Sequence, residues 1–378
     1  MSEPRVAFLI HGLVVGGAEK FFISLVNHFY RSGRDPLVIL LSDDNELFPE
    51  MDPGVSSVII KRSFKYDLRV GRKIKAVLKD NNINTVFCVG IFSFFLLKLY
   101  FPFNKKKKFF LSLHSTIPAT TKEHLLNYIY FRSISPNDTV IFICNAQKEY
   151  LGKKYFFRPA SSLVIYNGIN TAYFSVNENG TEARKKLKAQ LAIAETDKVI
   201  AKIARMFPEK GHTYGIDALE ILHRDYNCKA HLLYVGSGDK EYEEQVKQHA
   251  KRSAVANYVH FVPHQKDVRP YHHIADVFTL TSYSIETFSL AALEAMSSGL
   301  PCSLTNIGGA AEMIFEHTGM LSQAKNPSSI AKTWFDLLQK KFDARSLHDY
   351  VEANYSLDQM ICNYQKALLP ETASFSHN

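Results

Sequence analysis

The stretch SIETFSLAALEAMSSGLP, residues 284–301, decides the fold prediction. It follows an apolar strand-like run, and a helix is predicted to begin near Thr287–Ser289, where either hydroxyl can cap it, and to end at Gly299. Within that helix the sequence places one charged side chain, Glu294, and a second carboxylate, Glu286, stands just before it. A carboxylate among apolar neighbours is costly unless it has a partner, so Glu294 indicates a binding site.

Apolar runs rich in β-branched and aromatic residues alternate with amphipathic stretches along the rest of the chain. Such runs indicate parallel strands that are covered by helices on both faces of the sheet. The series runs twice, with a polar break over residues 167–198, and this predicts an α/β protein with two doubly wound, Rossmann-like domains. Ligands bind at the carboxyl ends of strands in such sheets, so the site is expected in a cleft between the domains. The expected strands are RVAFLI, PLVILL, TVFCVG, KFFLSL and TVIFIC in the first half, and KVIAKIA, AHLLYVG, VHFV and VFTLTS in the second.

The cysteines and the N-terminal residues favour a reducing compartment. The chain has 378 residues and five cysteines, with no CxxC and no HExxH pattern. This usage is typical of reduced, buried thiols in a cytosolic protein, and a metal site is not expected. The opening MSEPRVAFLIHGL is typical of a first strand rather than a signal peptide, and no apolar run approaches the ~20 residues of a spanning helix.

Positive charge is concentrated in the first half of the chain. Residues 1–166 contain 23 Lys and Arg against 13 Asp and Glu, whereas the formal charge of the whole chain is +8. Cations are interleaved with apolar residues over Lys61–Lys79, and Lys105–Lys108 follow the aromatic stretch Phe92–Phe103. This pattern favours contact with an anionic membrane surface, while the alternative is a buried aromatic helix beside a solvated run of charge.

Two features of the first domain are candidates for the site. Gly16 and Gly17 lie between the first strand and an amphipathic helix, where backbone N–H groups can approach a ligand. The spacing is not GxGxxG, and a simple tight turn is the alternative. His114 follows the strand KFFLSL, where an imidazole can line the cleft, although taken alone the residue is better explained as a plain loop histidine.

The second domain supplies the charged candidates. Arg205 and Lys210 lie on one loop beyond a strand, where two cations can clamp a diphosphate, or form a solvated basic loop. Eight residues leave Glu286 and Glu294 about 80° apart on an ideal helix, so they need not face each other as an acid–base pair. Carboxylates suit vicinal hydroxyls of a sugar or ribose, and the helix N-terminus beside them favours an anion.

Together these residues resemble family 4 of the retaining glycosyltransferases, with the GT-B fold of two Rossmann-like domains facing across a cleft. VIYNGIN resembles the family's interdomain segment, ARMFPEKG its basic donor loop, and SIETFSLAALEAMSSGLP followed by NIGGAAEMI its E-x7-E region. The resemblance covers most of the chain and is best over residues 160–320. It implies an N-terminal acceptor domain over 1–166, a nucleotide-sugar domain over 167–356, and a closing helix and frayed tail over 357–378.

The resemblance also implies residue roles. Arg205 and Lys210 would bind the donor diphosphate, Glu286 the donor sugar and Glu294 the ribose, with His114 beside the reacting sugar. Backbone amides of Phe288, Ser289 and Leu290 would contact sugar and phosphate, and Gly16 and Gly17 would lie near donor phosphate and acceptor. The family often has Gly-Phe-Gly after the first glutamate, whereas this chain has Thr287-Phe288-Ser289, a difference that bears on donor identity.

The expected activity is transfer of a sugar, with GalNAc from UDP-GalNAc as the specific choice, onto a lipid-diphosphate-linked saccharide in bacterial O-antigen or polysaccharide synthesis. No metal or other cofactor is expected, and the protein is expected to be cytoplasmic and peripheral on the inner face of the plasma membrane. The expected partners are a nucleotide-sugar donor, a lipid-linked acceptor and the membrane surface, without nucleic acid. Two alternatives remain: a nucleotide-sugar epimerase of the same fold, and a non-enzymatic basic module that binds membrane or nucleic acid.

Overall fold

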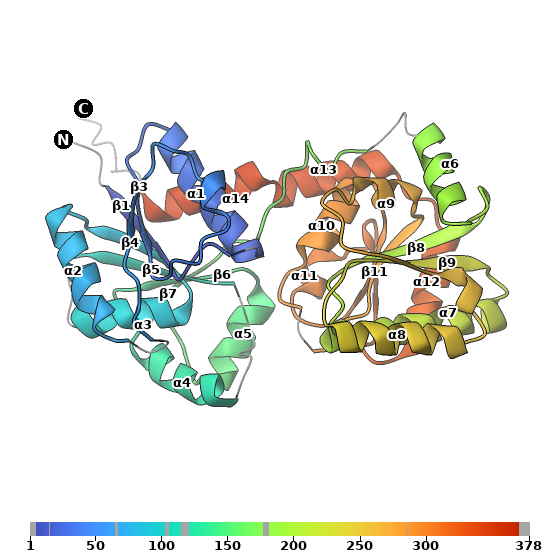
Figure 1. The fold of residues 1–378 in the computed structure, drawn as a ribbon, viewed down its shortest axis with the longest axis horizontal. Helices are drawn as coiled ribbons and strands as arrows, with labels where there is room; N and C mark the ends of the chain where they lie inside the picture. The colour runs from blue at the N-terminus through green and yellow to red at the C-terminus, as the bar shows by residue number, and fades with distance from the viewer. Residues whose placement is uncertain are drawn as a thin grey trace, which may run out of the picture. The chain divides into compact units, whose positions relative to one another are not determined.

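The chain forms two compact units, which are described separately. The computed structural model describes residues 5–14, 16–64, 67–102, 106–114, 121–176, 181–284 and 286–369. The first unit contains the chain up to Asn167 together with the chain from Met360 onward, and the second contains Gly168–Gln359. The predicted helix Leu357–Leu369 is observed as α14 (Leu357–Leu368), most of which groups with the first unit. Figure 1 shows a parallel sheet flanked by helices in each unit.

The first unit has a seven-stranded sheet in the order β3-β2-β1-β4-β5-β6-β7, and all neighbouring strands pair in parallel. Its five predicted strands form the buried centre of the sheet. The two strands that were not predicted, β3 and β7, are the edges, and their residues alternate between half-buried and exposed. The strands are β1 (Val6–Ile10), β2 (Leu37–Leu40), β3 (Ser56–Ile59), β4 (Thr85–Val89), β5 (Lys108–Leu113), β6 (Thr139–Phe142) and β7 (Ser161–Val164).

Helices cover this sheet, and they include the predicted aromatic stretch. The helices are α1 (Gly17–Arg31), η1 (Phe48–Glu50), α2 (Val70–Asp80), α3 (Ile91–Tyr100), α4 (Thr121–Arg132) and α5 (Asn145–Lys154). Helix α3 faces inward, because Phe94, Leu96 and Leu97 are fully buried in the core. Lys98 is buried too, and its ammonium lies 2.8 Å from the Asp138 carboxylate. Of the two interpretations of this stretch, the buried aromatic helix is therefore the one observed for its centre, where burial of a large apolar surface stabilises the fold.

The second unit has a six-stranded parallel sheet in the order β10-β9-β8-β11-β12-β13. The strands are β8 (Lys198–Ile203), β9 (Ala230–Val235), β10 (Val259–Val262), β11 (Val277–Leu280), β12 (Cys302–Thr305) and β13 (Gly319–Ser322). The four predicted strands, β8 to β11, are all present, whereas β12 and β13 were not predicted. The helices are α6 (Thr181–Gln190), η2 (Pro208–Lys210), α7 (His212–Tyr226), α8 (Lys240–Arg252), η3 (Ala256–Tyr258), α9 (Arg269–Ile274), α10 (Leu290–Ser297), α11 (Ala310–Met313), α12 (Pro327–Gln339) and α13 (Ala344–Tyr355).

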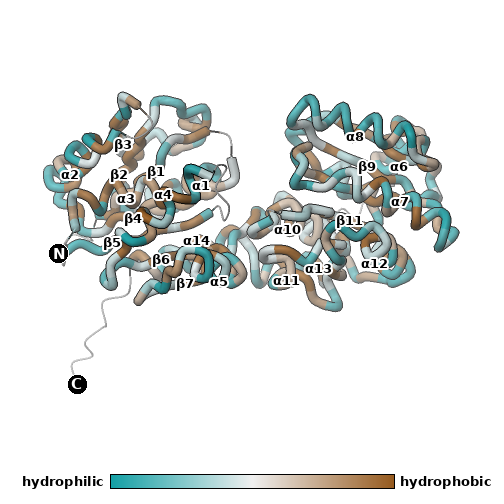
Figure 2. The backbone as a smooth tube through the Cα atoms, turned by 90° about the horizontal axis from the view of Figure 1, so that it is seen from below, coloured by the Kyte–Doolittle hydropathy of each residue, from teal (hydrophilic) through white to brown (hydrophobic). Residues whose placement is uncertain are grey.

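Helices of the second unit bury apolar side chains against the sheet, as expected for strands that are covered by helices. Trp334 of α12 is fully buried against the sheet, and its indole N–H donates to the Thr279 hydroxyl of β11 at 3.0 Å. By contrast, α8 is hydrophilic along most of its length, as Figure 2 shows, and it buries only Val246 and Ala250. All five cysteines are free thiols, and Cys88, Cys144 and Cys302 are buried. Within the described part of the chain, no helix is both long and apolar enough to cross a bilayer.

Candidate functional site

In the second unit, the charged candidates gather on loops at the carboxyl ends of β8 and β11. Lys210 ends the short helix η2 beyond β8, and Glu286 lies in the loop beyond β11. The Lys210 ammonium is 2.7 Å from the Glu286 carboxylate, which also accepts a hydrogen bond from the Ser282 hydroxyl at 3.0 Å. Both charged side chains are mostly buried, so the pair is shielded from solvent and is stronger than a surface ion pair.

A buried lysine that sequence reasoning missed holds these two loops together. Lys202 of β8 has no exposed surface, and its ammonium donates to the Thr281 hydroxyl at 2.7 Å and to the backbone carbonyl of Lys210. Burial, and then the nearby charge of Lys210, lower the pKa of Lys202 well below its usual value. Lysine in the middle of an apolar strand was the only available signal in the sequence. Its contacts tie the Lys210 loop to the end of β11 and so position Lys210.

Arg205 lies between β8 and η2 on the same loop. Its guanidinium stands 5.2 Å from the centre of the Phe207 ring, a cation–π contact that leaves the charge available to a ligand. The neighbouring backbone is tightly packed: the Met206 N–H donates to the Ser237 carbonyl at 3.2 Å, and the Asp239 N–H donates to the Met206 carbonyl at 2.9 Å. The loop that carries Arg205 and Lys210 is therefore fixed on both sides.

The loop NIGG, residues 306–309, packs against the backbone of Glu286. Gly308 has a φ of +54°, in the left-handed region, and a Cβ atom there would overlap the backbone carbonyl of Glu286. The Gly309 N–H donates to the carbonyl of Thr287 at 2.8 Å. The glycines thus allow a close approach that fixes the backbone at Glu286 and Thr287.

Helix α10 begins where the sequence predicts. Ser289 is its N-cap and accepts a hydrogen bond from the Ala292 N–H at 3.3 Å, so of the two predicted hydroxyls Ser289 is the cap. Phe288 is buried, 5.6 Å from the ring of Tyr355, and Leu290 is the first residue of the helix. Glu294 is half-buried on the second turn of α10. Separate contacts for the two carboxylates stay a prediction.

In the first unit, His114 follows β5 directly. Its Nε2 is 3.0 Å from the Ser112 hydroxyl, which in turn is 3.1 Å from the hydroxyl of Tyr364 on α14. The His114 ring also packs on Phe21 of α1, with ring centres 4.5 Å apart. Burial lowers the pKa of His114 to about 4, so this imidazole is neutral at pH 7 and can accept or donate a hydrogen bond.

His114 lines a cavity of about 490 Å³ within the first unit. The cavity lies at the carboxyl ends of β1, β4 and β5, and residues of α3 and α4 complete its walls. Gly16 is the N-cap of α1 in an extended conformation and Gly17 is the first residue of that helix, while Ala18 and Glu19 line the cavity. Burial raises the pKa of the Glu19 carboxyl. Glu19, His11 and Arg62 are polar groups of this cavity that sequence reasoning missed, because no motif marks them.

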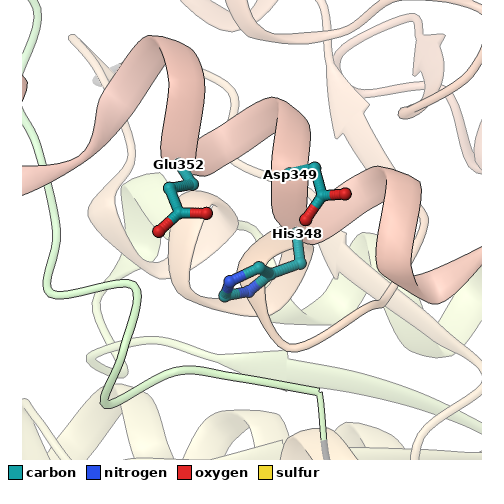
Figure 3. A group of neighbouring side chains, drawn as sticks. All are labelled: His348, Asp349 and Glu352. Carbon is teal, nitrogen blue, oxygen red and sulfur yellow. The ribbon is translucent and has the colours of Figure 1, made fainter.

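Side chains with a spacing that could hold a metal ion lie on α13, away in sequence from Lys210 and Glu286. Among the described residues, one group of candidate ligands consists of His348, Asp349 and Glu352, all on α13, with one ligand atom of each within 4.8 Å of the others (Figure 3). Asp349 forms an ion pair with Arg345 at 3.0 Å, and the His348 Nδ1 lies 2.8 Å from the Ser297 carbonyl. These contacts explain two of the three side chains without an ion, and metal independence stays a prediction.

Comparison with known proteins relates both units to one class of enzyme. Residues 15–173 match the family model described as Glycosyltransferase Family 4, and residues 183–356 match the model described as Glycosyl transferases group 1. An uncharacterized glycosyltransferase of Haemophilus influenzae is 24% identical over 337 residues, which cover 87% of this chain and 88% of that protein.

A second relative and a solved structure add detail. An Escherichia coli UDP-Gal:alpha-D-GlcNAc-diphosphoundecaprenol alpha-1,3-galactosyltransferase is 26% identical over 207 residues, about half of each chain (52% and 51%). The crystal structure of Anabaena HepE in complex with UDP superposes with a TM-score of 0.81, covering 96% of this chain and 99% of that chain at 19% identity. At that identity the superposition establishes the fold alone.

Proposed function

This chain belongs to glycosyltransferase family 4 with the two-domain GT-B fold, and from that premise we propose that it is a retaining transferase of N-acetylhexosamine. Our specific choice is GalNAc from UDP-GalNAc, transferred in α-linkage onto a saccharide carried on a lipid diphosphate, in bacterial O-antigen or polysaccharide synthesis. The observation that carries the proposal is the buried contact between Lys210 and Glu286 beside the N-terminus of α10.

The donor half of the reaction follows from charge. Breaking the bond between sugar and nucleotide leaves one further negative charge on the terminal phosphate of the diphosphate, and fixed cations lower the energy of that state. Arg205 and Lys210 would supply the cations, and the N-terminus of α10 would add its partial positive charge. Glu286 would accept hydrogen bonds from sugar hydroxyls and hold the Lys210 ammonium toward the phosphate, while Glu294 would accept those of the ribose.

The acceptor half rests on the first-unit cavity. Neutral His114 would contact the reacting sugar as a hydrogen-bond partner rather than as a fixed charge. The acceptor hydroxyl would lose its proton to the departing diphosphate as the new bond forms on the same face of the sugar, which gives retention. The E. coli relative acts on a saccharide linked to diphosphoundecaprenol, and this supports the choice of a lipid diphosphate as the acceptor's carrier.

Two measurements test the proposal. A thermal-shift screen of UDP-GalNAc, UDP-GlcNAc, UDP-Gal, UDP-Glc and GDP-mannose should raise the Tm selectively for one UDP-sugar, because a ligand that binds only the native state stabilises it. Transfer to a synthetic short-chain lipid diphosphate that carries one sugar should then give an α-linked product by NMR. A β-linked product contradicts retention, and isomerised donor in the absence of acceptor favours the epimerase alternative.

A further inference from the structure

Helix α4 exposes an apolar stripe on the side opposite the core. Leu125 is 66% exposed, Ile129 is 56% exposed and Tyr128 is 37% exposed, whereas Tyr130 and Phe131 of the same helix are buried. Residues three and four apart share a helix face, so the three exposed side chains form one continuous strip. Single exposed apolar residues are ordinary on a protein surface, but a continuous strip on one helix indicates a binding surface.

The chain that follows α5 extends this strip. Tyr155 packs under α4, with its ring 5.0 Å from the ring of Tyr128 and 4.8 Å from that of Phe131, and its hydroxyl is 2.9 Å from His124 Nδ1. The next residue, Phe156, is 87% exposed, and Phe157 is buried again. Phe156 is therefore an exposed ring next in sequence to Tyr155, which packs against α4.

Phe156 occupies a position that favours glycine. Its φ is +50°, and the Phe157 N–H donates to the Gly152 carbonyl at 3.0 Å, the hydrogen bond that closes a Schellman turn at the end of α5. An aromatic residue in the left-handed region is strained, and this one does not offset the strain by burial. Strain together with exposure indicates that the Phe156 ring serves a contact outside the unit.

Cations border the apolar strip. Lys122 and Arg132 lie on the exposed face of α4, before and after its apolar residues, and Lys154 and Arg158 flank Phe156 on either side. The exposed acid nearby, Glu149, lies 3.7 Å from Lys153 in an ion pair. Apolar side chains bordered by Lys and Arg match the boundary of an anionic bilayer, where rings enter the acyl region and cations meet the headgroups.

The other side of α4 lines the cavity that contains His114. Glu123, Leu126, Asn127, Tyr130 and Phe131 of α4 all contribute to the cavity wall. One helix therefore separates the apolar strip from the cavity proposed for the acceptor. A saccharide on a lipid diphosphate would reach that cavity from a bilayer held against the strip.

We propose that Leu125, Tyr128, Ile129 and Phe156, bordered by Lys122, Arg132, Lys154 and Arg158, form a surface that inserts into the headgroup region of an anionic bilayer. This inference deepens the proposed function and rests on it for the lipid-linked acceptor. It assigns membrane contact to α4 and the end of α5, whereas the sequence favoured the surroundings of α2 and α3.

The test is flotation of the full chain with vesicles of phosphatidylethanolamine and phosphatidylglycerol, compared with phosphatidylcholine alone. The triple variant L125S/I129S/F156S should partition at least roughly tenfold more weakly than wild type, because each substitution removes apolar area that the bilayer buries. The matched control is I59S/F64S/L68S, which removes three side chains that are 51%, 59% and 44% exposed near α2. The control should bind like wild type, and equal loss in both variants overturns the proposal.

A single variant separates binding from folding. Phe156→Gly relieves the left-handed strain and should raise the Tm while it weakens vesicle binding, two changes of opposite direction. Unchanged vesicle binding in both F156G and the triple variant overturns the proposal. Sedimentation without lipid distinguishes another occupant: a wild-type dimer that becomes monomeric in the triple variant assigns the surface to a second copy of the chain, and the bilayer proposal fails.

Transfer to a water-soluble acceptor separates this inference from the proposed function. The triple variant should retain wild-type transfer to a short-chain lipid diphosphate and lose transfer to the same saccharide on vesicle-bound undecaprenyl diphosphate. Vesicle binding without any transferase activity in wild type contradicts the proposed function and leaves the membrane surface standing. If the triple variant transfers sugar to the vesicle-bound acceptor as fast as wild type, the proposed membrane surface is wrong and the proposed function is unaffected.

Discussion

The ammonium of Lys210 and the carboxylate of Glu286 lie 2.7 Å apart, although 76 residues separate them in the sequence. If this lysine stabilises the leaving diphosphate, Lys210→Ala should chiefly lower turnover, by roughly 10²–10³-fold, with a smaller change in donor affinity. Steady-state kinetics with UDP-GalNAc as varied substrate measures both. Lys247→Ala is the matched control, because Lys247 pairs with Glu243 at 3.0 Å on α8 and is outside the proposed site. Wild-type turnover in Lys210→Ala contradicts the assignment.

Glu294→Ala should weaken binding of the nucleotide sugar by roughly tenfold or more, because hydrogen bonds to a charged acceptor are each worth about 1.5–3 kcal/mol. Calorimetric titration with UDP, and separately with the uncharged nucleoside uridine, measures the effect. Both affinities should fall, because the proposed partner is the ribose that the two ligands share. A loss confined to UDP would contradict a ribose contact and indicate an effect on the diphosphate.

Gly308→Ala should lower turnover by roughly 10²-fold, because the added methyl group overlaps the carbonyl of Glu286 and displaces the residue beside Lys210. Gly33→Ala is the matched control. Gly33 also has a positive φ, +78°, but a Cβ atom there meets nothing within 4 Å. Both variants should lose some stability in a thermal melt, and only Gly308→Ala should lose activity. Equal turnover in the two variants would remove the proposed role of the NIGG loop.

The stability of the second unit should fall as the pH drops below 6.5. Burial lowers the pKa of His272 to about 3, so an unfolded chain takes up a proton at this ring between pH 6.5 and 3 while the native ring stays neutral. The unfolded state is favoured progressively through that window. His272→Asn retains a donor for the Ser298 hydroxyl, which lies 3.2 Å from Nδ1, and removes the titration. The Tm of this variant should fall less steeply with acid, and parallel curves for variant and wild type contradict the account.

Sequence reasoning located the elements whose signal is local. Central strands such as β1 and β9 are buried along their whole length, and they appear in the sequence as unbroken apolar runs. The edge strands β3 and β7 were missed because one side of each strand remains exposed and the apolar pattern is diluted. The sequence left Thr287 and Ser289 as possible N-caps of α10. The structure assigns the cap to Ser289, because its side chain accepts a hydrogen bond from the Ala292 N–H.

The roles of residues whose partners are distant in the sequence could not be predicted from the sequence. Lys202 is in a strand that is otherwise apolar, and its importance follows from Thr281, 79 residues away. The inward orientation of α3 likewise depends on Asp138, which neutralises Lys98 in the core. In the sequence, the lysines that flank the aromatic stretch favoured a membrane surface, whereas the alternative of a buried aromatic helix is the one observed at the centre of α3.

Helix α14 has a consequence for how the protein is made. Tyr364 is fully buried among Phe21 and Phe87, and its hydroxyl is hydrogen-bonded to Ser112, so the last helix completes the core of the unit that is translated first. The second unit, Gly168–Gln359, is synthesised in between. On the ribosome the core of the first unit therefore stays incomplete, with part of its apolar interior uncovered, until α14 has been synthesised after the second unit. The first unit therefore begins to be synthesised before the second, but its core can be completed only after the second unit has been made.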